Sequence, residues 1–142
     1  MPLPRPAPGL VVRYSYLWAD EAEAGRKEGR KDRPCVGVVA AERRPDGQIR
    51  VLVAPITHAA KDPARGVELP GKVKRHLGLD EDVSWIVLDE FNEFVWPGPD
   101  LRTVPGRGPG VWAYGVLPRE VFHALRDRLR AVPRQRRTAR TE

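Results

Sequence analysis

Three residues near the middle of the chain carry side chains whose chemistry could be used together at one site. Arg33 stands directly before Pro34, and its guanidinium stays charged at neutral pH and can hold two phosphate oxygens at once. Thr57 offers a hydroxyl donor, and His58 offers an imidazole with a solution pKa of about 6.5, which suits a general base. A threonine at a strand end often makes only a local turn bond, and an arginine at a strand start is often only solvated.

The apolar pattern predicts how the chain brings these residues together. Residues 35–41 and residues 48–56 form two strand-like apolar runs, and the Arg-Pro-Asp-Gly sequence between them is typical of a tight turn. An antiparallel hairpin places the start of one strand beside the end of the next, so we expect Arg33 and Thr57 at the same edge. Consecutive strand residues face opposite sides, so His58 reaches that edge only if the strand has already ended.

The remaining elements predict a mainly β protein with a C-terminal helix. Further strands are expected at residues 10–17, 67–69, 85–88 and 91–96. Helices are expected at residues 70–77 and 118–132, and the second has an apolar stripe that should cover the sheet. Surface loops are expected over residues 18–33, which we interpret as a long mobile loop with a short helical turn over residues 19–24 as the alternative, and over residues 97–110, which hold four prolines and four glycines.

The chain is long enough for one domain with one core, since it has 142 residues. We expect this domain to span residues 9–132, after a proline-rich lead-in over residues 1–8 and before a basic, flexible tail over residues 133–142. Five or six short strands followed by one helix predict a small, strongly bent sheet or a partly open barrel.

The composition favours a polyanionic partner and excludes several kinds of site. The formal net charge is +6, and half of it lies in the last ten residues, which hold four arginines and one glutamate. A single cysteine, Cys35, excludes an internal disulfide and a cysteine-only metal site, and its apolar neighbours predict a buried thiol. No apolar run approaches the roughly 20 residues of a membrane span, and the N-terminus does not read as a secretory signal. We therefore expect a cytoplasmic protein with no membrane partner, no metal and no cofactor.

Taken in order along the chain, short motifs resemble those of the PemK/MazF (Kid-like) family of bacterial toxin endoribonucleases. The motifs are a first strand that begins at Gly9, the Arg33-Pro34 pair before a buried strand, Pro55-Ile56-Thr57 at the end of the next strand, and Val87-Leu88-Asp89-Glu90, with glutamate where glutamine is usual. The final helix also fits. Each motif is short, so their order over residues 9–132 carries the resemblance.

The resemblance implies an SH3-like small barrel of the PemK/MazF/CcdB type with a C-terminal helix. It implies a homodimer with an RNA groove and metal-independent cleavage of single-stranded RNA by attack of the adjacent 2′-hydroxyl, which leaves a 2′,3′-cyclic phosphate and a 5′-hydroxyl end. A cognate antitoxin protein would fill the groove with a partly disordered, often acidic segment. Arg33 matches the catalytic arginine of the family, and Thr57 matches its catalytic threonine.

The general base has two candidates. Glu28 lies five residues before Arg33, a spacing like that of an acidic residue in some family members, although cationic neighbours would lower its pKa. His58 is the alternative. Trp18 could stack on an unpaired base, beside a basic flank that could follow a phosphate backbone. This flank consists of Arg26, Lys27, Arg30 and Lys31.

Two other functions fit the same fold. The first is a non-catalytic module that binds RNA or a protein through the same basic edge, which the long charged loop before Arg33 leaves open. The second is a gyrase-poisoning relative that acts through its C-terminal end. We rank it last because the usual terminal aromatic residue is missing from the final sequence RTARTE.

Overall fold

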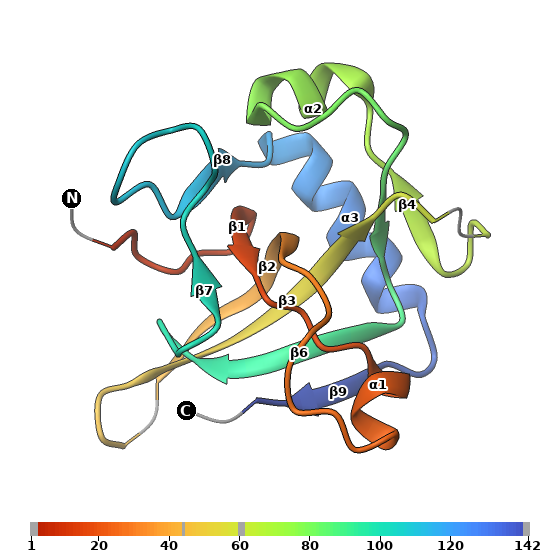
Figure 1. Ribbon diagram of the computed structural model, residues 1–142. Coiled ribbons are helices and arrows are strands. Elements are labelled where there is room, and N and C mark those ends of the chain that lie inside the picture. Colours follow the sequence, from red (N-terminus) through yellow and green to blue (C-terminus); the bar gives the residue numbers. More distant parts are fainter. Residues whose placement is uncertain (1–2, 44, 60–61, 141–142) are drawn as a thin grey trace.

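The computed structural model describes residues 3–43, 45–59 and 62–140, without the side chains of residues 39–43 (Figure 1). The described part of the chain forms nine strands and three helices. The strands are β1 (Leu10–Tyr14), β2 (Arg33–Arg43), β3 (Ile49–Thr57), β4 (Gly66–Glu68), β5 (Trp85–Val87), β6 (Glu90–Val95), β7 (Leu101–Arg102), β8 (Ala113–Val116) and β9 (Arg136–Ala139). The helices are α1 (Ala19–Glu23), α2 (Gly71–Leu77) and α3 (Arg119–Ala131).

One connected sheet is organised around β3. Along one edge β3 pairs with β2, while its other edge pairs first with β6, through Val53 and Asn92, and then with β5, through Ile56 and Ile86. β1 divides its partners in the same way between β7 and β8. α3 lies behind the sheet in Figure 1 and begins after Pro118, whose fixed φ suits a helix start. The prediction of a mainly β fold with a C-terminal helix is confirmed.

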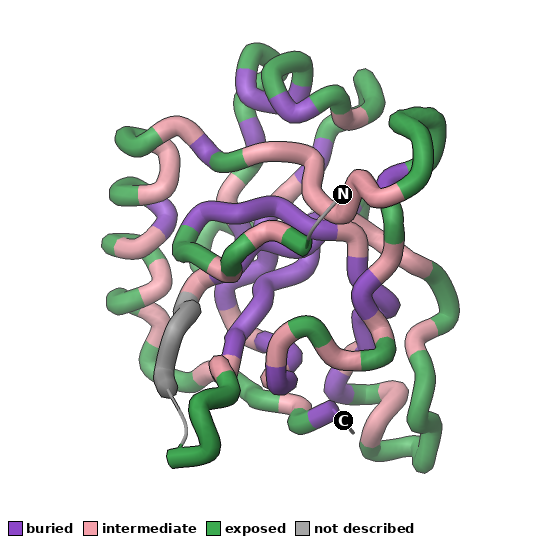
Figure 2. Tube along the Cα trace, turned by 90° about the vertical axis from the view of Figure 1, so that its left-hand side faces the viewer, coloured by how far each residue is buried: buried purple, intermediate pink, exposed green. Residues whose placement is uncertain are grey.

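Alternate side chains along the strands point to opposite faces of the sheet, where they form two apolar clusters. Figure 2 shows the central part of the trace as buried. One cluster includes Val36 of β2 and Leu125 of α3, together with residues of α2. The other includes Cys35 and Tyr14, and the Tyr14 ring stacks on Phe94 with ring centroids 4.5 Å apart. Helices therefore cover one face, while aromatic side chains fill the other.

The Cys35 thiol is expected to be chemically silent in the folded protein. Its side chain is 0% exposed, and burial raises the pKa of the thiol well above its ordinary value. A water-soluble thiol reagent should therefore modify Cys35 only after denaturant unfolds the chain. Stoichiometric labelling within minutes in native buffer would contradict this placement, and the labelling of the unfolded chain provides the control.

The turn between β2 and β3 agrees with the sequence pattern in its described part. Gly47 has φ +86°, a value that glycine adopts readily, and the Asp46 carboxylate accepts a hydrogen bond from Gln48 N at 3.0 Å. Arg44, the first residue of the predicted turn, lies outside the described residues, as do Met1 and Pro2 of the predicted lead-in.

The tail predicted to be flexible instead contributes a strand, β9, to the sheet. β9 pairs in parallel with β6, and the side chain of Arg140 is only 2% exposed. Its guanidinium donates to Ser15 O at 2.6 Å and to Asn92 Oδ1 at 2.9 Å, and it pairs with Asp100 Oδ2 at 3.2 Å. The folded unit therefore extends past residue 132. Residues 141–142 of the predicted tail lie outside the described part.

The loop predicted to be mobile over residues 18–33 is anchored at its first half, where it forms α1. The Glu90 carboxylate accepts hydrogen bonds from Ala19 N at 3.0 Å and from Tyr16 Oη at 2.9 Å. Arg136 of β9 pairs with Asp20 at 3.2 Å and with Glu23. These contacts connect α1 to β6 and β9, which are distant in sequence. The helices that the structure describes include none with the length and apolar character of a membrane span.

Candidate functional site

Arg33 and Thr57 lie at the same edge of the β2–β3 hairpin. The register pairs Cys35 with Pro55, and its continuation by two residues sets Arg33, the first residue of β2, opposite Thr57, the last of β3. Because β3 ends at Thr57, His58 is released from the strand alternation. The condition under which His58 could reach this edge is therefore met.

Beside this edge lies a cavity of about 350 Å³, here called the cationic cavity. Its polar lining comprises Arg13, Lys31, Asp32, Arg33, Arg107, His58, Asp80, Ser84 and Tyr114. Arg13 Nη1 donates to Tyr114 Oη at 3.1 Å, and Arg107 holds its place by donating to Leu77 O at 2.5 Å and to Tyr114 O at 3.0 Å. Four cations outnumber the two carboxylates, Asp32 and Asp80, so the lining carries a net positive charge that suits an anion.

Arg33 is a partly desolvated cation in the lining of this cavity. Its guanidinium carbon lies 5.0 Å from the centroid of the Trp18 ring. Burial lowers the pKa of Arg33 from its usual high value, which still leaves it protonated at neutral pH. Its Nε is buried and has no hydrogen-bond partner among the residues that the structure describes. A buried donor without a partner favours an anionic ligand that would supply one.

His58 is paired with a carboxylate that the sequence patterns did not indicate. His58 Nε2 lies 2.8 Å from Asp80 Oδ2. On the other side, Lys74 donates to Asp80 Oδ1 at 2.7 Å, to Ser84 Oγ at 2.7 Å and to Asp82 O. The neutral imidazole then carries its proton on Nε2, because Asp80 accepts it there, and Nδ1 is left as the basic nitrogen.

Asp80 remains ionised over a wide pH range. Partial desolvation raises the pKa of its carboxyl, but the hydrogen bond from Lys74 and the charge of His58 outweigh it and bring the pKa below its ordinary value. The Lys74 side chain is 5% exposed. The buried Lys74 ammonium therefore holds the Asp80 carboxylate in place, and Asp80 in turn orients the His58 imidazole.

Thr57 and Glu28 do not join this arrangement. Thr57 is buried, its Oγ1 accepts a hydrogen bond from Ala59 N at 3.1 Å, and it does not line the cationic cavity. This is the local turn bond that was expected as the alternative to a catalytic role for Thr57. Glu28 is exposed and lines neither the cationic cavity nor the hollow beside it.

No protein-family model, curated protein or solved structure matches this chain.

The predicted basic flank is only partly brought to the site. A second hollow, lined by Trp18, Glu21, Arg30, Lys31 and Arg33, adjoins the cationic cavity and shares Lys31 and Arg33 with it. Arg26 and Arg30 pair with Glu21 Oε2 at 3.6 Å and 3.1 Å, so part of their charge is balanced within the loop. Lys27 is exposed and lines neither hollow. Lys31 is therefore the member of the flank placed best for a ligand that enters both hollows.

Proposed function

We propose that this protein is a metal-independent endoribonuclease of the PemK/MazF type that cleaves single-stranded RNA. The observation that carries the proposal is the shared cavity, where the His58–Asp80 pair lines the same space as the permanently charged Arg33. The positive net charge and the motif order support it. A homodimer, a cognate antitoxin protein and a cytoplasmic location belong to the same proposal.

Cleavage would begin when His58 Nδ1 takes the proton of a 2′-hydroxyl and the 2′-oxygen attacks the adjacent phosphorus. Arg33, together with Lys31 and Arg13, would hold the phosphoryl oxygens as negative charge builds on them. The bond from phosphorus to the 5′-oxygen then breaks. Tyr114 Oη accepts a hydrogen bond from Arg13, so the hydroxyl proton of Tyr114 is not used in that bond and can be donated to the departing 5′-oxygen. The products are a 2′,3′-cyclic phosphate and a 5′-hydroxyl.

The test is incubation of the purified protein with a mixed-sequence RNA in EDTA, with DNA of the same sequence as the control. We expect the RNA to be cut into fragments with 2′,3′-cyclic phosphate and 5′-hydroxyl ends, and the DNA to stay intact because it lacks the attacking hydroxyl. Cleavage that EDTA abolishes, or that also occurs in DNA, would contradict the proposal.

A non-catalytic module that binds RNA or a protein is the second candidate. The burial of Thr57 favours it, because the threonine that matches the catalytic one of the family does not line the cavity and accepts a local hydrogen bond from Ala59 N instead. In the same experiment this candidate predicts a shift of the RNA in a native gel, with no fragments at any time.

Replacement of His58 by glutamine should lower the cleavage rate by about 10²–10⁴-fold, the usual contribution of a general base. Because His58 is half exposed, the fold should be unaffected. The measurement is the initial rate of RNA cleavage in EDTA. His76→Gln is the matched control, since His76 is an exposed histidine of α2 that does not line the cavity. Equal rates for the two variants would show that His58 is not the base.

A further inference from the structure

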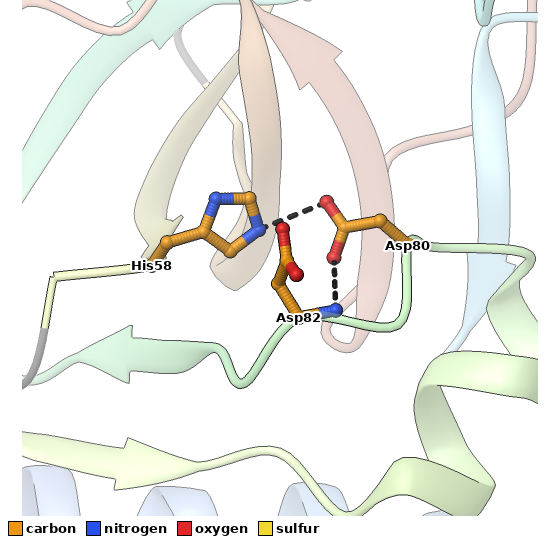
Figure 3. A group of neighbouring side chains, drawn as sticks. All are labelled: His58, Asp80 and Asp82. Atoms are coloured by element: carbon orange, nitrogen blue, oxygen red, sulfur yellow. Dashed lines mark hydrogen bonds and ion pairs between the residues drawn. The ribbon is translucent and has the colours of Figure 1, made fainter.

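A third side chain stands next to the His58–Asp80 pair and gives it the composition of a metal site. Figure 3 shows Asp82 beside the imidazole, with both carboxylates on the side of Nε2. One ligand atom from each of His58, Asp80 and Asp82 lies within 4.8 Å of the other two. Asp82 has no place in the proposed cleavage reaction and does not line the cationic cavity.

The Asp80 and Asp82 carboxylates differ in how many of their oxygens already accept a hydrogen bond. Asp80 Oδ1 is occupied by Lys74 and accepts a hydrogen bond from Asp82 N at 3.2 Å, so Oδ2 is the oxygen left for a metal. None of the residues that the structure describes pairs with the Asp82 carboxylate. The three side chains are exposed, and small rotations could bring their ligand atoms to the roughly 2.0–2.2 Å that a Zn²⁺ ion requires.

The donor set selects the class of metal. Magnesium and calcium prefer sites made wholly of oxygen, whereas an imidazole nitrogen with two carboxylate oxygens suits zinc and its neighbours. Lys74 offsets one of the two negative charges, which further disfavours hard cations that are held by charge alone. A metal held by three side chains also keeps a position for water, as open zinc sites do.

We propose that His58, Asp80 and Asp82 form an inhibitory Zn²⁺ site. The metal would take the place of the proton on His58 Nε2, and the neutral imidazole would then carry its proton on Nδ1. The nitrogen that would accept the 2′-hydroxyl proton is thereby blocked. The inhibition rests on the proposed endoribonuclease function, while the binding of the metal does not.

Binding is tested with untagged protein and zinc chloride, by competition with a chromophoric zinc chelator at neutral pH. We expect one Zn²⁺ per chain, and binding at least about tenfold weaker in Asp82→Ala and in His58→Gln, because even the loss of an outer-shell contact costs 10–100-fold. His123→Gln, which removes an exposed histidine of α3, should bind like the wild type. Absence of saturable binding, or full affinity in Asp82→Ala, would overturn the site.

Inhibition is tested separately on the RNA assay. Saturating Zn²⁺ should lower the cleavage rate at least tenfold, and excess EDTA should restore it. In Asp82→Ala the ratio of the rates with and without Zn²⁺ should approach one. Binding without inhibition would overturn the regulatory role. If the protein does not cut RNA even in EDTA, the endoribonuclease proposal fails, and the chelator competition still decides the metal site.

Discussion

Replacement of Arg33 by alanine is expected to lower RNA cleavage by about 10²–10³-fold, the cost of removing one donor that stabilises transition-state charge. Arg33 Nε is already buried and has no hydrogen-bond partner among the described residues, so less water has to be removed from it when a phosphate binds. Its guanidinium can also hold two phosphoryl oxygens together. The measurement is the initial cleavage rate in EDTA, with thermal unfolding recorded for the same sample.

Two companion variants separate charge from geometry. Arg33→Lys keeps the charge but loses the planar fork, so it should recover only part of the lost rate. Lys27→Ala removes an exposed cation of the same loop that lines neither hollow, and it should cut RNA at close to the wild-type rate. If Arg33→Ala and Lys27→Ala lower the rate equally, the loop acts only through its overall charge, and the role given to Arg33 is wrong.

Replacement of Arg140 by alanine is expected to have the largest effect on stability. It removes the buried partner of Asp100, together with the hydrogen bonds to Ser15 and Asn92 and the contact of the guanidinium with the Tyr14 ring, 5.4 Å from its centroid. Breaking a buried pair from one side costs about 3–5 kcal/mol. For a domain of this size, that loss corresponds to a fall in Tm of roughly 10 °C or more.

Arg137→Ala is the matched control for this variant, because Arg137 lies on the same strand but is exposed. Its side chain is 59% exposed and lies 3.8 Å from Glu93, a surface pair worth about 0–1 kcal/mol. Thermal unfolding followed by circular dichroism compares the two. A change of 1 kcal/mol in stability shifts Tm by roughly 2–8 °C. If the Tm of Arg140→Ala lies within about 2–3 °C of that of Arg137→Ala, β9 does not hold the fold together.

The β2–β3 hairpin was predictable because all of its signals are local. Apolar runs of strand length flank a Pro-Asp-Gly turn, and pairing across a tight turn follows from chain connectivity. α2 and α3 were predictable for the same reason, since an apolar stripe and a starting proline lie within one segment. The common edge of Arg33 and Thr57 follows from the hairpin alone.

The contacts that hold α1 and β9 in place could not be predicted from local sequence, although a short helical turn over residues 19–24 was one of the two alternatives. The segment after Trp18 is charged, and the final ten residues are rich in arginine, so both have the composition of solvated chain. Their order comes from partners distant in sequence. The Glu90 carboxylate accepts a hydrogen bond from the first residue of α1, and the charge of Asp100 offsets the desolvation cost of burying Arg140.

In the candidate site, too, some residues could be predicted from local sequence and others could not. Arg33 and His58 stand out by residue type and by their places at strand ends. Asp80 and Lys74 had no such signal, because their roles appear only when the segment after α2 folds back beside the end of β3. Thr57 matches a motif, but its hydroxyl is turned into a local bond, which shows that a motif fixes a position and not the access of a side chain to the cavity.

The most direct test of the account is a crystal structure of the protein with a single-stranded RNA whose 2′-hydroxyls are methylated, so that it binds but cannot be cut. We predict a phosphate in the cationic cavity, within hydrogen-bond distance of the Arg33 guanidinium and with the adjacent 2′-oxygen facing His58 Nδ1. An RNA backbone bound elsewhere, for example along α3 and β9 with the cationic cavity left empty, would contradict it.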